Sequence, residues 1–206
     1  MCGVILAAGE SSRMGKDKAL LPWPPGSGTG GSGQTFLSAA IESLNAFSEM
    51  VIVVAGSNAS NIAPVVYAQG AAVARNPAPD RGQFSSLQVG LQEVLNRGRD
   101  AAIITLVDRP PVNPLTLQTL CDAFATRAHD KWSVVPEYQG KHGHPFLVAR
   151  EMMEAFLKAE PTASARDIEH QHQQHIEYIV LNDPAVTLNV DTPQDYAALS
   201  SNTPAR

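Results

Sequence analysis

Short apolar runs and helically spaced apolar residues alternate along the first 130 residues of the chain. The apolar runs predict buried strands, and they cover residues 2–7, 50–55, 71–75 and 101–107. The helical spacing predicts helices over residues 34–47, 62–68, 85–97 and 114–128. Strands that alternate with helices in this way predict an α/β fold, with a parallel sheet covered by helices on both faces. Ligands bind such sheets beyond the carboxyl ends of the strands, so the segments after Ala7, Ala55 and Val107 are where a site is expected.

The second half of the chain has a less regular pattern. Residues 132–136 and 145–148 predict strands that flank a loop at 138–144, and helices are predicted over 151–158 and 163–174. Two late strands, at 178–181 and 186–190, precede a closing helix at 193–199. A chain of 206 residues with 44% hydrophobic residues suits one domain with a sizeable core. We expect that domain to span residues 1–199, with 200–206 as a flexible tail.

Charge narrows the class of partner. The formal net charge is −5, and all of it lies after residue 100, because the first 100 residues carry seven acidic and seven basic side chains. This balance argues against nucleic acid or an anionic membrane as a partner. No apolar stretch approaches the roughly 20 residues of a membrane helix, and the first apolar run is too short for a signal peptide. With Cys2 and Cys121 expected as reduced thiols, the sequence predicts a cytoplasmic protein.

A low-complexity segment of Gly, Ser and Pro occupies residues 22–33. It matches the G-x-G-x-x-G pattern twice, from Gly26 and from Gly28, which is the only support for an NAD-dependent oxidoreductase. A dinucleotide fingerprint follows a strand directly and opens a helix, whereas prolines precede this one. The pattern therefore favours a flexible loop. The phosphate-binding motif G-x-x-x-x-G-K-[ST] is absent from the sequence.

The segment LAAGESSRMGKDK, residues 6–18, follows the first predicted strand. Gly9 and Gly15 make this loop pliable, and its backbone N–H groups can form an anion nest. Arg13, Lys16 and Lys18 bring three positive charges within six residues, which suits a di- or triphosphate. The alternative is a solvated turn with surface bases.

Two aspartates stand at the ends of predicted strands. Asp108 follows the run AAIITLV and is expected on the same sheet edge as the loop within residues 6–18, called the Gly-rich loop below. Asp191 follows the last predicted strand. Carboxylates at such positions can hold Mg²⁺ together with phosphate oxygens. Alternatively, each aspartate can cap the helix that comes after it.

These pieces, in this order, resemble the MobA-like nucleotidyltransferase family, whose signature is LAAGxSxRMGxxK. The signature matches residues 6–18 without insertion, Asp108 falls on the aspartate of the family's GDxP turn, and Asp191 falls on its closing DTPxD motif. GQFSSLQVG at 82–90 and GHP at 143–145 resemble two further motifs of the family. Ala-Ala-Gly in the signature is similar to the cytidylyltransferase (MocA-like) branch, whereas guanylyltransferases typically have Ala-Gly-Gly.

The resemblance implies a Rossmann-like three-layer (GT-A-like) fold with a mostly parallel mixed sheet. It also implies transfer of a nucleoside monophosphate, CMP from CTP, to a terminal phosphate of molybdopterin, with release of pyrophosphate and with Mg²⁺ as cofactor. In this interpretation Arg13 and Lys18 hold the pyrophosphate, and Asp108 and Asp191 hold the metal. The nucleotide contacts are Leu6, Ala7, Ala8, Gly9, Ser85 and Ser86. His144 either faces the acceptor or is a structural histidine in its turn.

Departures from the family pattern leave the acceptor open. Val107 replaces the usual Gly, Arg109 stands where Gln or Met is common, and Asn189 replaces a frequent Asp. The alternatives are a GTP-dependent or sugar-phosphate nucleotidyltransferase and a non-catalytic protein that delivers molybdenum cofactor. A molybdenum hydroxylase would then receive the product. His170, His172 and His175 lack partners at ligand spacing beyond Glu169, so they predict a solvated polar helix or loop rather than a metal site.

Overall fold

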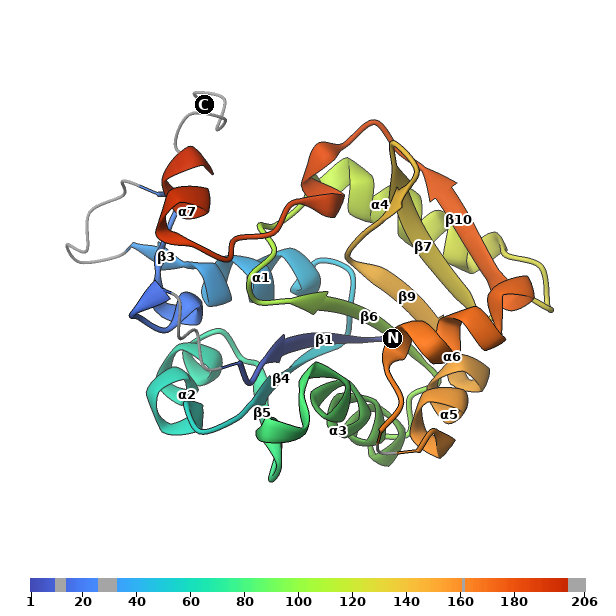
Figure 1. The fold of residues 1–206 in the computed structure, drawn as a ribbon, viewed down its shortest axis with the longest axis horizontal. Helices are drawn as coiled ribbons and strands as arrows, with labels where there is room; N and C mark the ends of the chain where they lie inside the picture. Colours follow the sequence, from blue (N-terminus) through green and yellow to red (C-terminus); the bar gives the residue numbers. More distant parts are fainter. Residues whose placement is uncertain (10–13, 26–32, 161, 200–206) are drawn as a thin grey trace.

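An eight-stranded sheet forms the centre of the molecule in a computed structural model of the chain, which describes residues 1–9, 14–25, 33–160 and 162–199 (Figure 1). The strand order is β10-β7-β9-β6-β1-β4-β5, and β8 pairs with β7. The strands are β1 (Cys2–Ala7), β4 (Met50–Ala55), β5 (Ala72–Arg75), β6 (Ala101–Leu106), β7 (Ser133–Tyr138), β8 (Lys141–His142), β9 (Phe146–Ala149) and β10 (Ile176–Val180). The pairs β1–β4, β1–β6, β4–β5 and β7–β10 are parallel. Strand β9 runs antiparallel to both of its neighbours, β6 and β7. The prediction of a mostly parallel mixed sheet in a three-layer α/β fold is confirmed.

Helices cover both faces of this sheet, in agreement with the sequence pattern. They are α1 (Phe36–Asn45), α2 (Ala59–Ala68), α3 (Gln83–Asn96), α4 (Pro114–Thr126), α5 (Arg150–Lys158), α6 (Ala165–Gln171) and α7 (Pro193–Leu199). Alternation along β1 separates the two cores: Ile5 and Ala7 belong to the cluster with α1, α2 and α4. Val4 and Leu6 belong to the cluster with α3, α5 and α6. The strand is buried on both faces, which explains why its sequence is an uninterrupted apolar run.

Local capping explains where several helices begin. Thr35 and Ser38 form a reciprocal capping box at the start of α1, and Ser164 and Asp167 form another at α6. Asn113 caps α4 by accepting a hydrogen bond from the Leu115 N–H, so Asp108 does not cap that helix.

The predicted strand at 186–190 is wrong. Residues Pro184–Thr187 instead form a 3-10 turn, η5, because the Asp183 carboxylate accepts a hydrogen bond from the Ala185 N–H and Pro184 suits the first helical position. The backbone then bonds to other segments: Val186 O accepts from the His144 N–H. Two smaller differences concern the neighbouring elements. The predicted loop at 138–144 contains β8, and the predicted helix at 163–174 is divided into α6 and the turn η4 (Gln173–His175).

The Gly/Ser segment lies between two short strands, β2 (Pro22–Trp23) and β3 (Gln34–Thr35), which pair antiparallel. Neither strand belongs to the main sheet, so the segment lacks the strand-to-helix setting of a dinucleotide fingerprint. Residues 26–32 lie outside the described residues, and they hold all of the first match and all but Gly33 of the second.

The histidine cluster packs on an aromatic side chain rather than standing free in solvent. The ring of His175 stacks on Trp132 at 3.7 Å between centroids, and His172 lies 5.2 Å from the same ring. His170 is exposed, as predicted. Across the described ranges, no group of three or more potential ligand side chains is arranged to hold a metal ion.

Both cysteines are free: Cys2 is buried in β1 and Cys121 is half-buried on α4. Burial raises the pKa of each thiol. Within the part of the chain that the structure describes, no helix is both long enough and apolar enough to cross a membrane.

Glu169 on α6 gives the fold a pH-dependent stability. Burial raises its pKa to about 7, and the nearby charge of Arg166 opposes this only in part. Because the folded state binds this proton more tightly than the unfolded chain, protonation of Glu169 stabilises the fold. This stabilisation is fully present below pH 4.5 and is lost as pH rises through 7. Glu169→Gln is therefore expected to raise the free energy of unfolding at pH 8 by about 1–3 kcal/mol.

Thermal unfolding at pH 8 and pH 4.5 tests this expectation, with the gain absent at pH 4.5. Glu151→Gln, an exposed change on the neighbouring α5, is the matched control and is expected to alter neither value by more than about 0.5 kcal/mol. An equal gain for Glu169→Gln at both pH values would contradict the assignment of the effect to this carboxyl group.

Candidate active site

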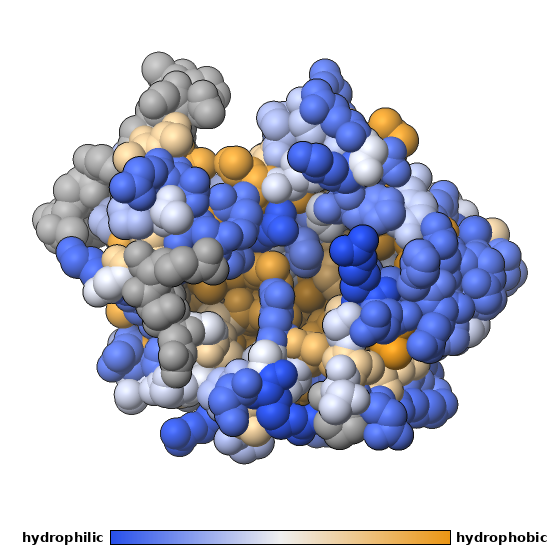
Figure 2. Space-filling model, in the orientation of Figure 1, coloured by the Kyte–Doolittle hydropathy of each residue, from blue (hydrophilic) through white to orange (hydrophobic). Residues whose placement is uncertain are grey.

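A cleft of about 510 Å³ lies at the carboxyl ends of β1 and β6. Its lining comes from four parts of the chain: Leu6, Ala8, Gly9 and Lys18; Pro79, Gly82, Gln83 and Ser86; Leu106, Val107, Asp108 and Arg109; and Asn189 and Asp191. Seen from the side of Figure 1, the surface is hollowed near the centre, with an apolar floor and a hydrophilic rim (Figure 2). The site therefore lies at the sheet edge where the sequence pattern places it.

The Gly-rich loop leaves β1 at Ala8 and Gly9. The turn after β4 packs closely against this point, since a Cβ on Gly56 would lie 2.7 Å from the Ala8 carbonyl oxygen. Residues 10–13 lie outside the described residues, so the predicted role of Arg13 is not located by the structure. Lys16 is exposed and does not line the cleft.

Asn58, in the turn after β4, holds the returning end of the loop. Its amide donates hydrogen bonds to the Ala7 carbonyl (3.0 Å) and to the Asp17 carboxylate (2.8 Å), and its carbonyl accepts one from the Gly56 N–H. Asp17 in turn caps the 3-10 turn η2 (Lys18–Leu20) through the Ala19 N–H. This chain of contacts fixes the backbone from which the Lys18 side chain extends into the cleft.

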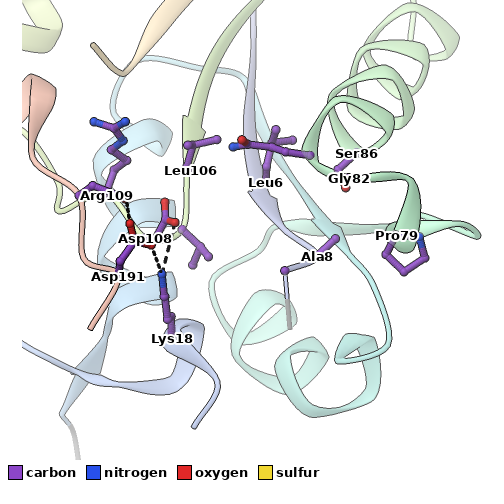
Figure 3. A pocket seen from close by; sticks show the side chains of 14 residues that line it. Leu6, Ala8, Lys18, Pro79, Gly82, Ser86, Leu106, Asp108, Arg109 and Asp191 are labelled. Carbon is purple, nitrogen blue, oxygen red and sulfur yellow. Dashed lines mark hydrogen bonds and ion pairs between the residues drawn. The ribbon is translucent and has the colours of Figure 1, made fainter. Parts of the chain in front are cut away.

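Lys18 lies between the two predicted metal ligands (Figure 3). Its ammonium nitrogen is 3.0 Å from Asp191 Oδ1 and 3.5 Å from Asp108 Oδ2. The lysine is buried, with 9% of its surface exposed. A buried ammonium requires such anionic partners, and the pairing draws together residues from three distant parts of the sequence.

Backbone contacts explain how Asp191 reaches Asp108. The Val190 N–H donates to the Asp108 carbonyl at 3.0 Å, which ties the C-terminal segment to the end of β6. Thr192 and Asp195 make reciprocal capping contacts at the start of α7, in which Asp195 accepts from the Thr192 N–H and Thr192 from the Asp195 N–H. Thr192 is therefore the helix cap, and the Asp191 carboxylate is left to face the cleft.

The donor set fits a hard divalent cation. Asp108 Oδ1 and Asn189 Oδ1 are buried and have no hydrogen-bond partner. The Asn189 amide donates to Asp191 Oδ2 at 2.5 Å, which orients that carboxylate. The two carboxylates both contact the Lys18 ammonium, and the Asn189 carbonyl oxygen lies beside them. These three groups match the oxygen ligands that Mg²⁺ prefers.

The two predicted nucleotide-binding serines have different surroundings. Ser86 lines the cleft, whereas Ser85 donates to the Gly82 carbonyl at 2.7 Å and does not line it. The buried Asn76 amide donates to both hydroxyls, at 2.8 and 3.0 Å. Ser85 thus fixes the start of α3, and Ser86 is the member of the pair that lines the cleft. Among the predicted backbone contacts, Leu6 and Ala8 line the cleft and Ala7 is buried in the sheet.

His144 lies in the turn before β9, and its Nδ1 is buried without a hydrogen-bond partner. Burial, with a smaller contribution from the charge of Arg109, lowers the pKa of His144 to about 3. The imidazole is therefore neutral at physiological pH. It does not line the cleft itself, and its ring packs edge-on against Phe146.

Sequence reasoning assigned no role to several residues that line the cleft. Arg109 was visible only as a departure from the family pattern, although its position next to Asp108 is a signal for the same sheet edge. Gln83 and Pro79 precede the Ser-Ser pair and carry no motif of their own. Burial lowers the pKa of the Arg109 guanidinium, and the charges of Asp108 and Asp191 oppose this change.

A family model described as the MobA-like NTP transferase domain matches residues 3–176. The chain belongs to this family. It is thus a nucleotidyltransferase, in agreement with the prediction from the signature. The matched segment includes Lys18 and Asp108, and Asp191 lies beyond it.

Two relatives carry different nucleotide names. A "probable molybdenum cofactor guanylyltransferase" of Rhodopirellula baltica is 33% identical over 60% of this chain, and the match covers 56% of that protein. The molybdenum cofactor cytidylyltransferase of Escherichia coli is 26% identical over 94% of this chain and 92% of its own length.

Solved structures agree with the fold. The crystal structure of Rv0371c from Mycobacterium tuberculosis has a TM-score of 0.78 and 26% identity, and the match covers 98% of this chain and 99% of that one. A manganese complex of the same protein gives a TM-score of 0.75 at 26% identity, covering 98% of each chain.

Proposed function

We propose that the protein transfers CMP from CTP to the terminal phosphate of a molybdopterin-type acceptor. The observation that carries the proposal is the convergence of Asp108 and Asp191 on Lys18 beside the Ala8–Gly9 turn. Both relatives reported above are named as molybdenum cofactor nucleotidyltransferases, the first of them as a probable one. CTP is favoured over GTP by the Ala-Ala-Gly of the signature and by the E. coli relative, whose similarity extends over most of both chains.

In this reaction an acceptor phosphate oxygen forms a bond to the α-phosphorus of the nucleotide. The bond from that phosphorus to the bridging oxygen breaks, and pyrophosphate leaves with the electron pair. Because the attacking phosphate is already anionic, no side chain has to remove a proton. The residues of the cleft therefore act by positioning the two substrates and by neutralising charge.

Asp108 and Asp191, with Asn189 beside them, would hold the divalent cation. When bound, this ion supplies Lewis-acid neutralisation of the triphosphate. The Lys18 ammonium offers a compact positive charge to the departing pyrophosphate. Ser86 and the backbone of Ala8 and Gly9 contact the base and ribose. The manganese complex of the related Rv0371c supports the use of a divalent metal, and we infer Mg²⁺ as the ion used.

The proposal includes a cytoplasmic location and a molybdenum hydroxylase that receives the product. The location is inferred from the two free thiols, Cys2 and Cys121, and the hydroxylase from the resemblance to the family.

The test is to incubate the protein with Mg²⁺, molybdopterin and each of the four NTPs in turn, and to measure pyrophosphate. We expect release with CTP at least about tenfold faster than with GTP. Faster release with GTP would reassign the nucleotide and keep the reaction. Release with none of the four NTPs would overturn the proposed acceptor, and a sugar phosphate would then be the next acceptor to assay.

A further inference from the structure

Arg109 lies on the other side of the Asp108–Asp191 pair from Lys18 (Figure 3). In the close view its guanidinium extends away from Lys18, beyond the Asp108 carboxylate (Figure 3). Nη1 donates a hydrogen bond to the Leu188 carbonyl at 3.3 Å. Nε is buried, and none of the described residues is its hydrogen-bond partner.

Strand direction brings His144 to the same place. In the antiparallel pairing of β6 and β9, Ile104 is opposite Phe146. The chain after β6 and the chain before β9 therefore run alongside each other, and Arg109 and Pro145 line one small cavity. The His144 backbone N–H donates a hydrogen bond to the Val186 carbonyl at 2.8 Å. Its ring Nδ1 is buried without a partner among the described residues.

Arg109 lines the cleft and has a buried Nε for which the described residues supply no partner, and this combination indicates a ligand. A buried donor or acceptor without a partner is costly, and a ligand that supplies the partner recovers that cost. Asp108 and Asp191 lie near enough to act on the charge of Arg109, but none of the described residues forms an ion pair with it. The guanidinium is a cation with a donor to spare, so the group that suits it is an anion. A guanidinium presents a planar fork of N–H donors, which suits phosphate or carboxylate oxygens.

The cleft already contains a separate cation for the nucleotide. Lys18 approaches the two carboxylates from the side of the Gly-rich loop, whereas Arg109 lies on the side of β9 and the 183–190 segment. The carboxylates lie between them, at the place where the two substrates have to meet. An anion bound by Arg109 is therefore the second substrate rather than the triphosphate.

We propose that Arg109 binds the attacking phosphate monoester of the acceptor, with the buried His144 packed at the same end of the cleft. This inference rests on the proposed function and specifies its second substrate as a phosphate monoester that carries two negative charges. Arg109 lowers the repulsion between this phosphate and the triphosphate, and it selects against acceptors that offer a hydroxyl group alone.

The first experiment observes the arginine directly. In a ¹H–¹⁵N NMR spectrum of the folded protein, the Arg109 Nε–H signal is identified as the one missing from Arg109→Lys. Orthophosphate is the probe, titrated without nucleotide. We expect this signal to shift with saturation, and the signal of Arg81, an exposed arginine of the turn η3 on the other side of the cleft, to stay in place. An Nε–H signal that does not move would overturn the proposal.

The second experiment separates the two substrates kinetically. With CTP and molybdopterin, Arg109→Gln is expected to raise the KM for the acceptor by about tenfold or more, and to change the KM for CTP by less than about twofold. Arg109→Lys retains the charge without the fork and is expected to fall between wild type and glutamine. Arg81→Gln is the matched control and should resemble wild type. A raised KM for CTP with an unchanged KM for the acceptor would overturn the proposal.

The two experiments distinguish this inference from the proposed function. If wild type releases no pyrophosphate with molybdopterin, the proposed function fails, and the shift of the Arg109 signal still decides whether this subsite binds phosphate. If wild type is active and the Arg109 signal does not respond, the reaction stands and the subsite is rejected.

Discussion

Replacing Asp108 with alanine is expected to lower nucleotidyl transfer by about 10³-fold or more while leaving the protein folded. The change removes one of the two carboxylates that would hold the divalent cation, and charge neutralisation of this kind is commonly the largest part of catalysis in phosphoryl chemistry. Stability is expected to remain because Asp108 Oδ1 is buried without a hydrogen-bond partner and Lys18 keeps its 3.0 Å contact with Asp191. Pyrophosphate release from CTP plus acceptor measures the first effect, and thermal unfolding measures the second.

Asp122→Ala is the matched control for this prediction. Asp122 is exposed on α4, and its carboxylate contacts only the neighbouring Gln118 amide among the described side chains. The control is expected to retain wild-type turnover. Near-wild-type turnover by Asp108→Ala would remove this carboxylate from the metal site, and Mn²⁺ binding followed by electron paramagnetic resonance gives an independent readout of the same assignment.

Gly143→Ala is expected to destabilise the fold by about 3 kcal/mol or more. A Cβ at this position would lie 2.1 Å from the Val186 carbonyl oxygen and 2.7 Å from its carbon. Both are backbone atoms, so no side-chain rotation relieves the clash and the 183–190 segment has to move. That segment leads directly to Asp191, so we expect turnover to fall together with stability. For a chain of this length the midpoint of thermal unfolding should drop by about 6 °C or more.

Gly140→Ala separates this clash from the general cost of replacing a glycine in the same loop. Gly140 has a φ of 74°, which costs an alanine about 1 kcal/mol, and nothing lies within 4 Å of the added Cβ. Its unfolding midpoint should fall by only a few degrees, with turnover retained. Equal effects of the two variants would contradict the steric explanation for Gly143.

The fold was readable from the sequence where burial is complete. Strands β1, β4 and β6 are covered on both faces, so they are continuous apolar runs whose limits differ from those predicted by at most one residue. The 186–190 segment, by contrast, alternates apolar residues like a strand, yet its backbone partners include His144, in the turn before β9, and Asp108. Apolar periodicity does not record where a backbone finds its hydrogen bonds, and the correcting signal was Asp183-Pro184, a capping residue followed by a proline.

The site divides along the same line. Lys18, Asp108 and Asp191 belong to contiguous motifs and could be named from the sequence, because each motif carries its own chemistry. Asn58 and Arg109 could not be assigned a role in the same way. Asn58 acts through contacts with Ala7 and Asp17, residues 51 and 41 positions away, and the importance of Arg109 depends on a neighbour that only the strand pairing reveals.

The reversed direction of β9 has a consequence for which loops reach the rim of the cleft. For a strand parallel to its neighbours, the residues at this edge of the sheet are those that follow the strand. For an antiparallel strand, the residues at the same edge are those that precede it. In this molecule the two kinds of approach meet at one rim: Asp108 and Arg109 arrive behind β6, while Gly143 and His144 arrive ahead of β9. One inverted strand therefore lets a single sheet edge present two sets of loops, which grow from opposite chain directions and are able to diverge independently.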